Sequence, residues 1–193
     1  MRFINAEFIK SASKKSEFIV DELPQIALVG RSNVGKSSLI NLLTNNSKLA
    51  KTSSTPGRTR LVNYFNINKE VYLVDLPGYG FHKASKSISG AWDAVMNDYF
   101  TDNTALKLTL VLLDARLNPT ELDMQMLDYL AELEIPSAIV LTKADKLNRS
   151  ELNLQIDRVS KALRFNKNLI IPTSASKKQG VEKLATLVDE FLK

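Results

Sequence analysis

One stretch of the chain has the residue types and spacing of a phosphate-binding loop. Residues 30–37, Gly-Arg-Ser-Asn-Val-Gly-Lys-Ser, fit the P-loop pattern G-x-x-x-x-G-K-[ST]. Glycines let backbone N–H groups approach phosphate oxygens, and a helix that starts behind the loop adds partial positive charge. We expect Lys36 to reach the β- and γ-phosphates and the Ser37 hydroxyl to ligate Mg²⁺. The residues expected around the phosphates are Gly30, Arg31, Ser32, Asn33, Val34, Gly35, Lys36 and Ser37.

A second candidate group follows the apolar run at 71–74. Asp75, Leu76, Pro77 and Gly78 form a D-x-x-G pattern. A carboxylate at Asp75 can hold Mg²⁺ through water, and the Gly78 N–H can sense a γ-phosphate. An ordinary Asp-Pro-Gly turn is the alternative, and the P-loop upstream makes it the weaker interpretation.

A third group has the chemistry to select a base. A carboxylate at Asp145 can accept hydrogen bonds from guanine N1–H and N2–H₂, and adenine offers neither donor. The Lys143 stem would cover the base, and the small Ala175 would let its backbone N–H reach guanine O6. An N-cap cluster for the last helix is a compatible interpretation of residues 173–176. The residues predicted at the base are Thr142, Lys143, Ala144, Asp145, Ser174, Ala175 and Ser176.

The elements that must position these groups alternate between strands and helices. Apolar runs predict parallel strands at 26–29, 108–113, 138–141 and 169–171, and an antiparallel hairpin from 61–67 and 71–74. Helices are expected at 38–43, about 91–100, 120–135, about 152–163 and 181–191. The prediction is a three-layer αβα fold of the P-loop type, with a mostly parallel six-stranded sheet and one antiparallel strand. Ligands of such sheets bind outside the carboxyl ends of the strands, where every candidate falls.

Length and composition favour one nucleotide-binding domain. The chain has 193 residues, and we expect residues 22–193 to form this domain. Residues 1–21 are expected to pack on it as an extension, with an added edge strand as one option. The absence of cysteine excludes disulfides and Cys-ligated zinc, and fits a reducing cytoplasm. No signal-peptide pattern or membrane-length apolar run is present, so a cytoplasmic protein without a membrane span is expected.

The net charge of +5 is compatible with an anionic partner such as RNA, and equally with a solvated surface.

Taken in order, the motifs resemble a translation-factor-type small GTPase of the TrmE-Era-EngA-like class. More narrowly, they resemble the EngB (YihA/YsxC) family of bacterial ribosome-assembly GTPases. The resemblance runs from about residue 5 to the C-terminus. The runs that carry it are 30–37, Thr-Pro-Gly-Arg-Thr at 55–59, Asp-Leu-Pro-Gly-Tyr-Gly at 75–80, Asp-Ala-Arg at 114–116, 142–145 and 174–180. Most GTPases have Asn where this chain has Thr142, whose shorter side chain keeps a hydrogen-bonding group.

The resemblance implies further site residues and a cellular role. Mg²⁺ would be bound directly by Ser37 and Thr59, with Thr55 as the competing choice and Asp75 acting through water. Residues lining the phosphates would include Gly57, Arg58, Thr59, Arg60 and Leu61. The implied function is a switch that hydrolyses GTP during assembly of the large (50S) ribosomal subunit and supports growth, cell division and septation. Its partners would be ribosomal RNA and ribosomal proteins, and we expect a monomer.

The catalytic candidates are Lys36, Thr59, Gly78 and Asn33. In Ras-like enzymes a Gln after D-x-x-G orients the attacking water. This chain has Tyr79 there, so slow hydrolysis is predicted, at or below roughly 10⁻³ s⁻¹. Two interpretations of Asn33 stay open: it helps to hold K⁺ in place of an arginine finger, or it only shapes the loop.

Two other classes of function are compatible with a P-loop. An ATP-dependent small-molecule kinase is disfavoured, because the predicted base site suits guanine and no lid or acceptor site is visible. The other is an RNA-binding scaffold in which the nucleotide is only structural. An experiment is needed to distinguish such a scaffold from a switch.

Overall fold

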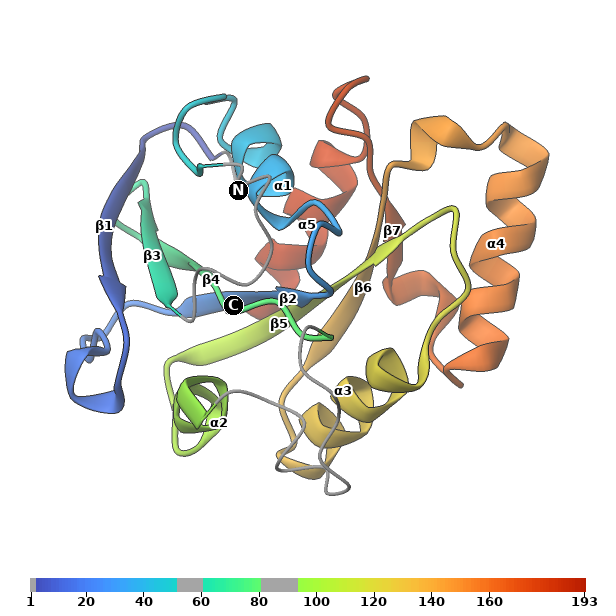
Figure 1. The fold of residues 1–193 in the computed structure, drawn as a ribbon. Helices are drawn as coiled ribbons and strands as arrows, with labels where there is room; N and C mark the ends of the chain where they lie inside the picture. Colours follow the sequence, from blue (N-terminus) through green and yellow to red (C-terminus); the bar gives the residue numbers. More distant parts are fainter. Residues whose placement is uncertain (1–2, 52–60, 81–93) are drawn as a thin grey trace.

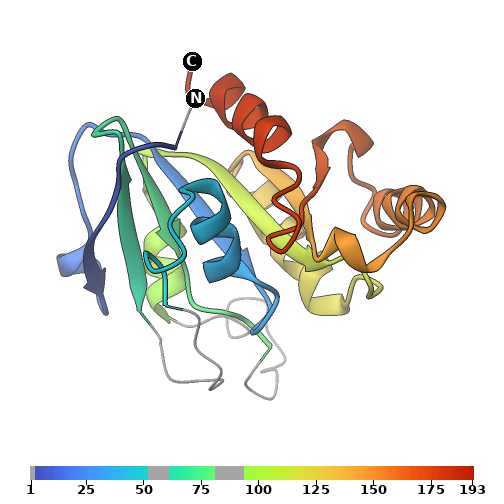
Figure 2. The same ribbon diagram turned by 90° about the horizontal axis from the view of Figure 1, so that it is seen from above.

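The computed structural model describes residues 3–51, 61–80 and 94–193 (Figures 1 and 2). These residues form a seven-stranded sheet in the order β1-β3-β4-β2-β5-β6-β7. The strands are β1 (Ala6–Ala12), β2 (Gln25–Gly30), β3 (Val62–Ile67), β4 (Val71–Asp75), β5 (Leu106–Asp114), β6 (Ser137–Thr142) and β7 (Ile170–Pro172). The helices are α1 (Lys36–Leu43), α2 (Ala94–Phe100), α3 (Glu121–Glu132), α4 (Arg149–Ala162) and α5 (Val181–Phe191).

The sheet confirms the predicted fold class and adds one strand to it. Strand β3 runs antiparallel to both neighbours, β1 and β4, and the other adjacent strands are parallel. It is therefore the one antiparallel strand that was expected. The count of six was too low, because the N-terminal extension supplies β1 at the edge of the sheet. There Ala6 lies opposite Ile67, and Ala12 lies opposite Val62.

Both faces of the central sheet are buried, because alternate residues of each strand pack against different helices. On β2, Ala27 and Val29 pack in a core shared with α2, α3 and α4, whereas Ile26 and Leu28 pack with α1 and α5. Figure 1 shows these two layers on opposite sides of the sheet, and Figure 2 shows α1 and α5 side by side on one face. A strand buried on both faces has a continuous apolar sequence, as residues 26–29 do.

The start of helix α3 bears on the site. Helix α3 begins at a capping box, in which the Thr120 N–H and hydroxyl both donate to Asp123 Oδ2, at 2.7 and 2.8 Å.

Helix α2 begins at Ala94 in the described part of the chain, and residues 91–93 of its predicted span lie outside that part. None of the described helices combines the length and apolar character that a membrane crossing requires.

Candidate nucleotide-binding site

The P-loop lies between β2 and α1, in the strand–loop–helix context that its mechanism requires. Strand β2 ends at Gly30 and α1 begins at Lys36. A Cβ on Gly30 would lie 2.8 Å from Val34 Cγ1 and 2.9 Å from the Leu112 carbonyl, so only glycine fits. Gly35 has φ +113°, a conformation that L side chains rarely adopt. Asn33 has φ +63°, in the left-handed region that asparagine tolerates better than most residues.

The D-x-x-G segment lies directly against this loop, although it begins 38 positions after the loop ends at Ser37. The Tyr79 N–H donates to the Gly30 carbonyl at 3.2 Å, and the Ser32 N–H donates to the Tyr79 carbonyl at 3.3 Å. A Cβ on Gly78 would come within 3.0 Å of Ser32 Oγ. The two segments predicted to contact phosphate therefore form one backbone unit.

Lys36 and Asp75 are the charged pair inside this unit. Lys36 Nζ lies 3.8 Å from Asp75 Oδ1, and both side chains are largely buried, at 12% and 15% exposed. Asp75 Oδ1 has no hydrogen-bond partner among the described residues. Burial raises the pKa of Asp75 and the Lys36 charge opposes that rise. The carboxylate has spare acceptor capacity where a hydrated cation would add donors.

These residues fit Mg²⁺ better than a metal with many protein ligands. Mg²⁺ in nucleotide sites takes one or two protein oxygens and completes its shell with phosphate and water. Ser37 supplies a hydroxyl in the first turn of α1, and Asp75 supplies a carboxylate oxygen that has no hydrogen-bond partner among the described residues. No group of three or more His, Cys, Asp or Glu side chains that could hold a metal occurs in the described residues. Magnesium bound here would neutralise charge that develops on transferring phosphate oxygens.

At the other end of the site, Asp145 is held in place by a buried serine. Asp145 lies in the short 3₁₀ helix η3 (Ala144–Lys146), directly after β6. The fully buried Ser174 donates its hydroxyl to Asp145 Oδ1 at 2.6 Å, and Ser176 Oγ lies 3.2 Å from Ser174 Oγ. The Ser174 hydrogen bond lowers the pKa of Asp145, so the carboxylate is ionised at neutral pH. Ala175 and Ser176 are exposed in the turn after β7.

Thr142 connects the two ends of the site. Its buried hydroxyl donates to the Val34 carbonyl at 2.7 Å and lies 3.2 Å from the Leu113 carbonyl. Both acceptors are backbone groups of the protein, so the hydroxyl hydrogen is used to fix the P-loop on β6. The predicted hydrogen bond from Thr142 to a base stays a prediction, and the structure adds this packing role.

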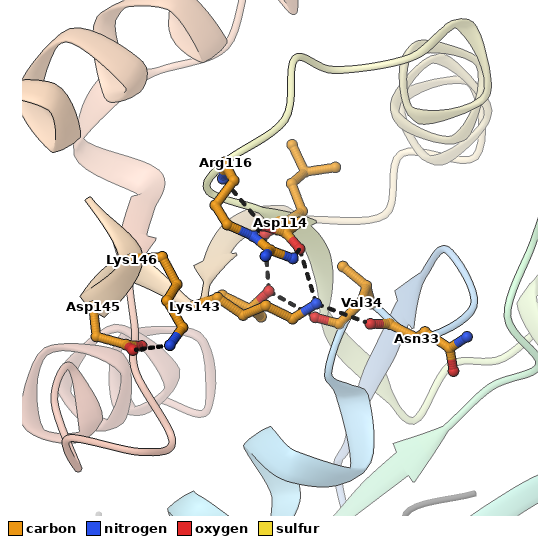
Figure 3. Close-up of polar contacts among 9 residues, drawn as sticks. Asn33, Val34, Asp114, Arg116, Lys143, Asp145 and Lys146 are labelled. Carbon is orange, nitrogen blue, oxygen red and sulfur yellow. Dashed lines mark hydrogen bonds and ion pairs between the residues drawn. The ribbon is translucent and has the colours of Figure 1, made fainter. Parts of the chain in front are cut away.

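Lys143 makes a second connection between the two ends of the site (Figure 3). It also contacts Asp114, a residue to which the sequence analysis assigned no role in the site. Lys143 Nζ donates to the Asn33 carbonyl at 3.2 Å and to Asp114 Oδ2 at 2.8 Å. Asp114 ends β5 and also accepts from Arg116. Burial would raise the pKa of Asp114, but hydrogen bonds from Arg116 and Lys143 outweigh it and hold this pKa far below its ordinary value. The signal in the sequence was its position, an acidic residue directly after a continuous apolar strand.

Tyr79, the residue in the position of the water-orienting Gln, is 4% exposed. Its hydroxyl donates to Asp123 Oδ1 at 2.7 Å, and Asp123 is itself buried at the start of α3. Burial raises the pKa of Tyr79 well above its ordinary value, so the phenol stays neutral. The hydroxyl thus fastens the D-x-x-G segment to α3.

Five predicted residues of the first switch loop lie outside the described residues: Thr55, Gly57, Arg58, Thr59 and Arg60. Leu61 is described and lies directly before β3. The remaining site residues lie at the carboxyl ends of β2, β4, β6 and β7, in the loops that follow these strands, in the first turn of α1 or in η3.

Comparison with known proteins gives the same family as the sequence motifs. A family model described as "50S ribosome-binding GTPase" matches residues 25–143. Proteins called "Probable GTP-binding protein EngB" are similar along most or all of the chain. The one from Caldanaerobacter subterraneus is 40% identical over 192 residues, covering 100% of this chain and 99% of its own. The one from Mesoplasma florum is 47% identical over 167 residues, covering 86% and 84%.

Solved structures agree on the fold. A crystal structure of a probable GTP-binding protein engB superposes with a TM-score of 0.71 at 23% identity, covering 87% of this chain and 98% of its own. Era, crystallised with MgGDPNP and nucleotides 1506–1542 of 16S ribosomal RNA, gives 0.66 at 24% identity, covering 88% of this chain and 57% of its own. The sequence relatives settle the family: this chain belongs to the EngB family of GTP-binding proteins and is a GTPase.

Proposed function

We propose that this GTPase binds GTP and GDP with Mg²⁺ across the carboxyl edge of its sheet. The phosphates would lie on residues 30–37 and 75–78, and guanine on residues 142–145 and 174–176. The observation that carries this placement is the direct connection between the two groups, from Thr142 to the Val34 carbonyl and from Lys143 to the Asn33 carbonyl. One ligand with a phosphate end and a base end fits two loops joined in this way.

The proposed chemistry is slow hydrolysis of GTP. Lys36, the loop amides and Mg²⁺ would stabilise charge on the phosphates. The Tyr79 hydroxyl is buried against Asp123, which supports the view that Tyr79 does not orient water. A GTPase with a low intrinsic rate suits a timed switch, in which GTP orders two loops and hydrolysis releases them.

We also propose that the switch acts in assembly of the large ribosomal subunit, and that growth and septation depend on it. The description of the matching family model and the net charge of +5 support contact with a ribosomal particle. If the protein is instead an RNA-binding scaffold with a structural nucleotide, its binding to the ribosomal particle should be the same in every nucleotide state.

Co-sedimentation with 50S particles tests this role. The chain is incubated with GDP, with a non-hydrolysable GTP analogue, or with no nucleotide, and its amount in the pellet is measured. Nucleotide-dependent pelleting that is lost in Asp145→Asn and kept in Asp128→Asn is the expected result. Asp128 is the matched control, because it is an exposed acid on α3. Equal pelleting in all three states would favour the scaffold.

A further inference from the structure

Asp114 has its acceptor capacity filled from within the protein. Its Oδ2 accepts from Lys143 Nζ at 2.8 Å and from Arg116 Nη2 at 2.7 Å. Its Oδ1 accepts from the Arg116 N–H at 3.1 Å and from Arg116 Nε at 2.9 Å. A carboxylate offers about four lone-pair positions, so these four donors leave Asp114 little capacity to bind a metal or take a proton. A group in this state can act only by holding its neighbours.

The two cations around Asp114 differ in what they reach. Arg116 is 48% exposed, and its backbone N–H and guanidinium contact Asp114. Lys143 is 35% exposed and extends from the end of β6 to the P-loop, where it meets the Asn33 carbonyl (Figure 3). Strands β5 and β6 are paired so that Asp114 lies opposite Thr142, the residue before Lys143. The sheet register thus places this carboxylate beside the base-recognition loop.

The Lys143 ammonium has space to move if nothing holds it. A cavity of about 230 Å³ lies beside it on the α3 side of the P-loop, with Arg31, Asn33, Leu117 and Asp123 among its other lining residues. A lysine side chain has a flexible four-carbon stem and loses considerable rotamer freedom when it is fixed. One long contact to a carbonyl, at 3.2 Å, would not hold such a side chain firmly. The shorter, charge-assisted contact to Asp114 supplies the constraint.

We propose that Asp114 is a positioning residue for the nucleotide site, which acts through Lys143. It fixes the lysine as a brace between the base-recognition loop and the P-loop, so that the stem is already in place to cover the guanine plane. The inference rests on the proposed placement of the nucleotide at this face. Arg116 holds the outer side of Asp114 through two side-chain hydrogen bonds, and it contributes less to the nucleotide site because these contacts do not extend to the P-loop as those of Lys143 do.

A double-mutant cycle on the affinity for fluorescently labelled GDP tests the proposal with the full chain. Asp114→Asn keeps the shape of the side chain and removes its charge, and we expect it to weaken binding about tenfold. Lys143→Met keeps the stem and removes the ammonium. Because Asp114 acts through Lys143, the double variant should bind no more weakly than Lys143→Met. Arg116→Gln is the control and should change the affinity less than about threefold.

Additive losses in the double variant would overturn the proposal, since they would show that Asp114 acts independently of Lys143. Inosine diphosphate, which lacks the N2 amine, gives a second readout. Asp114→Asn should weaken GDP and inosine diphosphate by the same factor, because Asp145 is untouched; unequal factors would also overturn the proposal. If Asp114→Asn does not fold, the cycle is run with Asp114→Glu under the same criterion. A wild-type chain that binds no GDP would instead refute the proposed function.

Discussion

Asp75 and Asp145 both follow parallel strands at the same edge of the sheet, and the protein surrounds them in opposite ways. Asp145 receives a hydrogen bond from the buried Ser174, and its pKa is lowered. Asp75 Oδ1 is buried and has no hydrogen-bond partner in the described residues, and Lys36 Nζ lies 3.8 Å from it. Burial raises the pKa of Asp75. At the proposed base end the protein itself supplies the hydrogen bond to the carboxylate, whereas at the proposed phosphate end one carboxylate oxygen has no hydrogen-bond donor among the described residues.

This difference indicates where a ligand must supply the missing interactions. A preorganised acceptor at Asp145 can discriminate between bases at once, because the carboxylate needs no rearrangement. The Asp75 carboxylate oxygen that has no hydrogen-bond donor gains one only when a hydrated cation binds together with the phosphates. We therefore expect base selection to be independent of Mg²⁺ and phosphate binding to depend on it.

Asp145→Asn should have the largest effect. The change replaces an acceptor with an amide that presents a donor to guanine N1–H or N2–H₂, and a polar site with the wrong pairing rejects its ligand strongly. We expect GDP affinity to fall by at least about 100-fold, with or without Mg²⁺. Titration of labelled GDP measures it, and Asp128→Asn should bind like the wild type. A loss seen only with Mg²⁺ would contradict the proposed division of the site.

Asp75→Asn should act on the metal and spare the base. A residue that holds Mg²⁺ through water typically contributes about 10–100-fold to metal affinity. We expect the variant to need that much more Mg²⁺ to tighten GDP binding, while its affinity in EDTA stays within about threefold of the wild type. Mg²⁺ titrations of the GDP complex measure the shift. An unchanged Mg²⁺ requirement would show that Asp75 is not part of the metal site.

A change of monovalent cation distinguishes the two interpretations of Asn33. If Asn33 helps to hold K⁺ near the phosphates, turnover of GTP should be about tenfold faster in KCl than in NaCl at equal ionic strength. Phosphate release under single-turnover conditions measures both rates. Equal rates would leave Asn33 with the role its backbone already suggests, since φ +63° suits asparagine in a tight loop.

Ser174→Ala should have the smallest effect and a defined pH dependence. Loss of the hydrogen bond to Asp145 should weaken GDP binding about fivefold. Because the folded pKa of Asp145 lies below its unfolded value of about 3.8, its stabilising contribution is present above that pH and is lost as the pH falls through the folded pKa. The stability deficit of Ser174→Ala in urea should therefore be constant at neutral pH and shrink at acid pH.

Ser160→Ala is the matched control for that measurement. The Ser160 hydroxyl donates to the Phe165 carbonyl at 2.8 Å, so the variant loses a hydrogen bond to a group that does not titrate. Ser174→Ala also loses contacts of its hydroxyl with the Lys177 N–H and the Ser176 hydroxyl, and these groups do not titrate in the acid range either. The deficit of Ser160→Ala should not vary with Asp145 ionisation. Identical pH profiles for the two variants would show that Ser174 does not act on the Asp145 carboxylate.

The placement of many candidate site residues could be predicted, because local sequence patterns mark them. Gly30 and Gly35 are required by a close approach and by a positive φ, so the P-loop pattern and its conformation are tightly linked. Asp75 ends a short apolar run and Asp145 follows another closely, and the carboxyl ends of parallel strands meet at one edge. The fold class followed from the alternation of such runs with helices.

Other features depend on contacts between distant segments, which no local pattern contains. Asp114 meets Lys143 because β5 and β6 are neighbours in a given register. Tyr79 meets Asp123 because α3 packs beside the D-x-x-G segment. The seventh strand was missed as a firm prediction, since Phe8 and Ile9 are partly exposed on an edge strand and give no buried apolar pattern. Tertiary packing decided all three.

The most direct test of the central claim is a competition experiment on the purified chain. Labelled GDP is displaced with increasing GTP, GDP or ATP, once with Mg²⁺ and once with EDTA. We predict displacement by both guanine nucleotides and none by ATP at a thousandfold higher concentration, in either condition, because Asp145 is preorganised for guanine before any cation binds. Displacement by ATP as readily as by GDP would contradict the account.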